Sequence, residues 1–126
     1  MSSGNQPPTV RRMKTYTGTT GYVYQYYFVG KRNALESDPD APAVEFIFDI
    51  TPDRKTMYAT SVFLKQEGLD AWAGQHQRPL TDPEQYAAAK LRLFRAFDEI
   101  ENIREHLRLV IDAVNIEEIL SSLDLG

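Results

Sequence analysis

Cysteine is absent from this sequence of 126 residues, which excludes disulfide bonds, thiolate metal sites and cysteine nucleophiles. The sequence also has no apolar run near the ~18 residues that a membrane helix requires. Residues 1–10 lack the apolar core of a secretory signal. Together these absences predict a cytoplasmic protein without a membrane partner.

An excess of basic residues is missing as well. The chain has 14 Lys and Arg against 18 Asp and Glu, for a net charge of −4. Because nucleic-acid-binding proteins usually present a strongly basic face, nucleic acid is an unlikely partner. Glycine-rich phosphate loops, nucleophile elbows and zincin motifs do not occur. The sequence therefore predicts no cofactor, no metal site and no catalytic residue, and an enzyme is the least favoured of three functions.

The two histidines have ordinary structural interpretations. Asp98, Asn102 and His106 share one face of a predicted helix, where polar pairs four residues apart are common. His76 lies in a predicted loop with no carboxylate close to it in the sequence. We interpret both histidines as surface residues rather than as metal ligands or acid–base groups.

Three stretches have the composition and alternation of β-strands. The cleanest is the second, in which Val44, Phe46, Phe48 and Ile50 fall on one face and polar residues on most of the other. A turn around Pro52 joins it to the third stretch and predicts an antiparallel hairpin. The predicted sheet is a three-stranded antiparallel meander made of residues 16–32, 43–51 and 56–64.

A heptad pattern dominates the C-terminal part of the chain. Its a and d positions are all apolar: Tyr86, Ala89, Leu93, Ala96, Ile100, Ile103, Leu107, Val110 and Val114. This pattern predicts one long amphipathic helix over residues 82–114, which begins at a capping box formed by Thr81 and Glu84. Short helices are predicted before and after it. The alternative for residues 107–114 is a fourth strand. The predicted fold is a single α+β domain over residues 15–126, after a flexible tail of residues 1–14.

The length of this helix has a consequence for assembly. It would span about 50 Å, whereas a compact domain of this size is ~36 Å across. The far end of the helix would then expose apolar side chains unless a second chain covered them. The sequence therefore predicts a homodimer with contacts through Ile103, Leu107, Val110, Ile111 and Val114. The leading function is a non-catalytic protein-interaction or accessory subunit whose further partner is unknown.

The first predicted strand suggests an alternative function. Tyr22, Tyr24 and Tyr26 alternate onto one face, and Lys31 and Arg32 follow them. Such a surface could stack a small planar ligand or single-stranded nucleic acid, which would make the protein a binding module.

The same strand has two structural interpretations. In one, the tyrosine face forms the core beneath the helix or an aromatic interface. In the other, the smaller set of Val23, Tyr27 and Val29 packs beneath the helix, to which it is better suited. The tyrosine side chains would then have to be buried against something other than the long helix, and we favour contact with protein over contact with a ligand.

Overall fold

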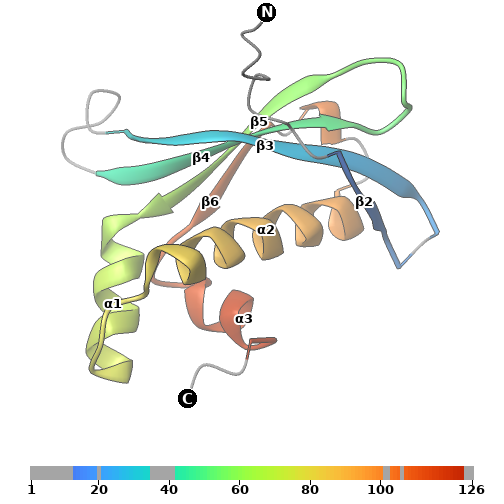
Figure 1. The fold of residues 1–126 in the computed structure, drawn as a ribbon. Coiled ribbons are helices and arrows are strands. Elements are labelled where there is room, and N and C mark those ends of the chain that lie inside the picture. The colour runs from blue at the N-terminus through green and yellow to red at the C-terminus, as the bar shows by residue number, and fades with distance from the viewer. Residues whose placement is uncertain (1–12, 20, 35–41, 101–102, 106, 124–126) are drawn as a thin grey trace, which may run out of the picture.

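The computed structural model describes residues 13–19, 21–34, 42–100, 103–105 and 107–123. Within these ranges, five strands form one mixed sheet, and the α-helices lie together on one side of it (Figure 1). The α+β class predicted from the sequence is confirmed. The predicted tail lies outside the described residues as far as residue 12, and Lys14 already begins a strand.

The sheet is larger than the sequence predicts. Its order is β2-β3-β4-β5-β6, and the strands are β2 (Lys14–Thr17), β3 (Val23–Asn33), β4 (Ala43–Thr51), β5 (Tyr58–Lys65) and β6 (Arg108–Ile111). The three predicted strands correspond to β3, β4 and β5, which are antiparallel neighbours. A three-stranded antiparallel sheet is nevertheless wrong, because β2 extends one edge and β6 pairs in parallel with β5 at the other.

The central strand β4 follows its alternating pattern. Phe46, Phe48 and Ile50 are at most 1% exposed and face the helices. The hairpin to β5 turns at Asp53, whose carboxylate accepts hydrogen bonds from the backbone N–H groups of Lys55 and Thr56 at 2.8 and 2.9 Å. These bonds replace ladder partners inside the turn and fix the register of the hairpin.

The predicted long helix is wrong. The helical elements are α1 (Gln66–His76), α2 (Asp82–Glu99), a 3₁₀ turn η1 (Ile103–Glu105) and α3 (Ile116–Leu120). Helix α2 ends because Ile100 adopts an extended conformation, at φ −100° and ψ 115°. Its start is as predicted, since Thr81 and Glu84 form a capping box.

Residues 108–111 form strand β6. For this segment the alternative prediction of a further strand is therefore correct, and the prediction of a helix is wrong. Leu109 and Ile111 point toward the helices and are buried, whereas Arg108 is exposed on the other side. The same apolar residues satisfy a heptad and a two-residue alternation, so the pattern alone does not separate helix from strand. The edge of β5 decides the outcome, because it offers backbone partners such as the N–H of Ser61, which donates to Leu107 O at 2.9 Å.

Small residues bring the helices close to the sheet. Ala88, Ala89 and Ala96 of α2 are fully buried and lie in the same core cluster as Leu93. In α1, a Cβ added at Gly68 would lie 3.0 Å from the backbone carbon of Asp112. The glycine thus permits α1 to approach the chain that follows β6, although it weakens the helix locally.

Candidate interaction surface

The residues predicted to bind a ligand do not share one accessible surface. Tyr24 and Tyr26 are 6% and 4% exposed and lie beneath α2, where the Tyr24 ring stacks on Phe97 with centroids 4.3 Å apart. Tyr22, by contrast, is 64% exposed. A planar ligand could not reach Tyr24 or Tyr26 while α2 is in place.

Strand alternation puts the two predicted basic residues, Lys31 and Arg32, on opposite faces, and a register shift between Phe28 and Gly30 decides which face each one takes. After it, Lys31 is opposite the buried Phe46, on the helix side, and Arg32 is opposite Glu45, on the other side. The expectation that Val23, Tyr27 and Val29 pack beneath the helix is wrong. The aromatic set fits there because the alanines of α2 leave room for rings.

The predicted interface residues also separate. Ile103 and Ile111 are 3% and 0% exposed within the core of the chain itself. Leu107 and Val110 are half-buried, and Val114, in the turn after β6, is 91% exposed. The helical face on which a dimer contact was predicted therefore does not exist, although dimerisation itself stays a prediction.

The face of the sheet away from the helices is the most distinctive surface, and we call it the outer face (Figure 1). Strand alternation and register place Tyr27, Glu45, Ile47, Phe63 and Val110 on it, and Val29, within the register shift, follows Phe28 of the helix side. Val29, at 39%, is one of the large apolar residues that are well exposed. Met13 and Met57, at 44% and 43%, precede β2 and β5 by one residue, where alternation continues the same face.

A charged network lies at the centre of the outer face. The Nε of Arg32 donates to Glu45 Oε1 at 2.8 Å, and the hydroxyl of Ser61 donates to Glu45 Oε2 at 2.6 Å. The guanidinium of Arg108 sits 4.3 Å from the centroid of the Phe63 ring. Burial raises the pKa of Glu45, but the hydrogen bonds and the charges of Arg32 and Arg108 outweigh it and hold the pKa below its ordinary value. Glu45 is thus a charged but neutralised group on this face.

A second polar cluster joins the helices at the opposite side of the protein. The His76 ring stacks on Trp72 with centroids 4.1 Å apart, and His76 Nε2 lies 3.0 Å from a carboxylate oxygen of Glu117 in α3. The interpretation of His76 as a loop residue with no carboxylate nearby is therefore wrong, because His76 is the last residue of α1 and contacts Glu117. The sequence gives no signal for this contact, because Glu117 is 41 residues away.

The polar set predicted on one helix face was Asp98, Asn102 and His106. Asn102 and His106 lie outside the described residues, and Asp98 accepts a hydrogen bond from the Tyr16 hydroxyl.

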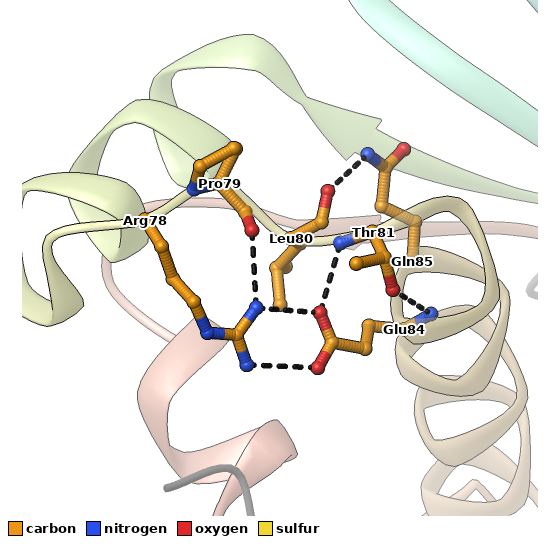
Figure 2. A network of polar contacts seen from close by, with 6 residues as sticks. All are labelled: Arg78, Pro79, Leu80, Thr81, Glu84 and Gln85. Atoms are coloured by element: carbon orange, nitrogen blue, oxygen red, sulfur yellow. Dashed lines mark hydrogen bonds and ion pairs between the residues drawn. The ribbon is translucent and has the colours of Figure 1, made fainter.

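Figure 2 shows the link between α1 and α2, which is closed by one bidentate ion pair. Both terminal nitrogens of Arg78 donate to the carboxylate of Glu84 at 2.9 Å. The same carboxylate accepts from the N–H of Thr81 at 2.8 Å, and the Thr81 hydroxyl accepts from the N–H of Glu84 at 3.3 Å. The contact with Arg78, followed by that with the Thr81 backbone, lowers the pKa of Glu84 to about 2.

This lowered pKa predicts acid sensitivity of the helix start. The folded pKa is about 2 and the ordinary value is 4.5, so the stabilising effect is complete above the ordinary value and is lost as the pH falls toward 2. We expect Glu84→Gln to lower the free energy of unfolding at neutral pH, with a difference from the wild type that shrinks on acidification. Urea unfolding between pH 2 and pH 7 measures it, and a difference independent of pH would contradict it.

The described residues contain no group of three or more His, Asp or Glu side chains placed to hold a metal ion. Likewise, none of the helices in the described ranges is long and apolar enough to cross a membrane. Comparisons with protein-family models, curated proteins and solved structures found no match. The fold and its surfaces define an α+β protein whose mixed sheet carries helices on one side and a partly apolar outer face on the other.

Proposed function

We propose that the chain is a cytoplasmic, non-catalytic interaction or accessory subunit that self-associates through its outer face. The observation that carries the proposal is that the α-helices lie together on one side of the sheet (Figure 1). Strand register places the half-buried side chains of Tyr27, Ile47 and Val110 on the other side. Val29, Met13 and Met57 add exposed apolar side chains to that face, and exposed apolar groups that cluster on one face often mark an interaction site. The predicted binding module is less well supported, because Tyr24 and Tyr26 are covered by α2.

The size of the outer face is consistent with a second copy as the partner. Strands ~4.8 Å apart with a rise of ~3.3 Å per residue give a sheet face on the order of 500 Å². Two such faces would bury about 1,000 Å², the lower limit for a biological interface. Because Arg32 pairs with Glu45, this carboxylate does not enter the contact as an unpaired charge.

Mass in solution tests the proposal directly. The wild type should be a dimer at micromolar concentration by light scattering or sedimentation. Ile47→Asp, which places a carboxylate at the middle of the face, should be a folded monomer, because burying an unpaired charge in the contact is costly. Val29→Asp provides a second variant at a position that is 39% exposed and tolerant of substitution.

The matched control is Val114→Asp, which adds the same charge at a predicted interface residue outside the sheet. It should leave the dimer intact, since Val114 lies in the turn after β6. A wild type that is monomeric at micromolar concentration would refute self-association. Dissociation by Val114→Asp but not by Ile47→Asp would instead place the contact near the C-terminal turn.

A further inference from the structure

One stripe of α2 runs along the edge of the sheet formed by β2 and β3. Its residues recur every four positions and therefore form one ridge that winds gradually around the helix: Asp82, Tyr86, Lys90, Phe94 and Asp98. Each of them meets one or more side chains from the two strands. We call this row of contacts between the five residues of α2 and the side chains of β2 and β3 the seam.

At its two ends, the seam pairs polar groups of complementary character. Lys31 Nζ lies 4.0 Å from a carboxylate oxygen of Asp82. At the far end, the Tyr16 hydroxyl donates to Asp98 Oδ2 at 2.7 Å. Burial, followed by the hydrogen bond to Asp98 and the charge of Asp98, raises the pKa of Tyr16 to about 12.

Aromatic pairs occupy the next positions inward. The Tyr86 ring lies edge-on to Phe28, with centroids 4.9 Å apart. The Phe94 ring stacks on Tyr16, with centroids 4.4 Å apart and nearly parallel planes. Both arrangements are among those that aromatic rings favour.

The central position brings two like charges together. Lys14 precedes Tyr16 by two residues in β2 and points to the same side of the sheet, and Lys90 precedes Phe94 by one helical turn. Lys90 Nζ lies 4.9 Å from the centroid of the Tyr86 ring. Burial, and after it the charge of Lys14, lowers the pKa of Lys90. Within the described part of the chain, no carboxylate forms an ion pair with either lysine.

We infer that Lys14 and Lys90 form a binding site for a doubly charged oxyanion of the phosphate type. At the other four positions of the seam, the side chains in contact attract each other. At the central position two positive charges meet instead, and a bound anion would compensate both of them. A phosphate group carries close to two negative charges at neutral pH, which matches two ammonium groups. The neighbouring Tyr86 ring provides an apolar side for the organic part of a phosphate ester. This site lies on the helix side of the sheet and does not depend on self-association.

Calorimetric titration of the full chain with inorganic phosphate tests the inference, with sodium chloride at equal ionic strength as the reference. Phosphate should bind saturably at one site per chain. Lys14→Gln and Lys90→Gln should each weaken binding at least about tenfold, since each removes one of the two charges. Lys55→Gln, in the exposed turn before β5, is the matched control and should bind as the wild type does.

Titration with phenyl phosphate distinguishes the two possible ligands of this site, a small phosphate ester and the free phosphate anion. Tighter binding than inorganic phosphate indicates a small phosphate ester, and equal binding indicates the free anion. In the absence of phosphate, Lys14→Glu should raise the midpoint of thermal unfolding, because it replaces a repulsive pair with an attractive one. The inference is overturned if phosphate acts no differently from chloride, or if Lys14→Glu lowers the midpoint. Neither result bears on the mass of the protein in solution.

Discussion

Ile111→Asp should prevent stable folding of this protein. Ile111 is fully buried in the core, on the parallel edge strand β6. An unpaired carboxylate there would cost more than about 4 kcal/mol, a large part of the ~5–15 kcal/mol that stabilises a typical domain. Circular dichroism and urea unfolding measure the loss.

Val114→Asp is the control for that variant, because the two residues are close in the chain but differ in environment. Val114 is 91% exposed, so its replacement should change the free energy of unfolding by less than about 0.5 kcal/mol. If Ile111→Asp were instead folded but monomeric, Ile111 would be an interface residue, as the overhanging end of the predicted long helix implied, and its place in the core would be wrong.

Phe48→Ala should lower the free energy of unfolding by roughly 3–5 kcal/mol, because it leaves a large cavity. Phe48 is 0% exposed and packs among the rings of Phe28, Tyr26 and Tyr86, with centroids 5.5 to 6.4 Å away. Those neighbours belong to the adjacent strand β3 and to helix α2, which cannot collapse readily into the space. Urea unfolding of the two proteins gives the difference.

Tyr22→Ala provides the comparison, since it also removes an aromatic ring that belongs to the tyrosine pattern. Tyr22 is 64% exposed, and the expected change is below about 1 kcal/mol. A loss under ~1 kcal/mol for Phe48→Ala would mean that the core beneath α2 is packed differently.

Local patterns in the sequence determined several elements of this fold. The alternation of Phe46, Phe48 and Ile50 is enough to predict both β4 and its buried face, because a strand has a fixed period of two. The capping box of Thr81 and Glu84 is likewise local, since its two hydrogen bonds join residues three apart. Such features depend on neighbours in the chain, and the α+β class follows from them.

Tertiary structure alone decided which groups from distant parts of the chain meet. Residues 108–111 suit a helix or a strand, and the edge of β5 makes them a strand by offering backbone partners. The tyrosine face of β3 became core because α2 faces it with alanines and with Phe94 and Phe97. The outer face and the Lys14–Lys90 pair arise in the same way, from register and packing between elements. Periodicity within a segment specifies which side chains share a face, but the surface opposite that face is set by the rest of the fold.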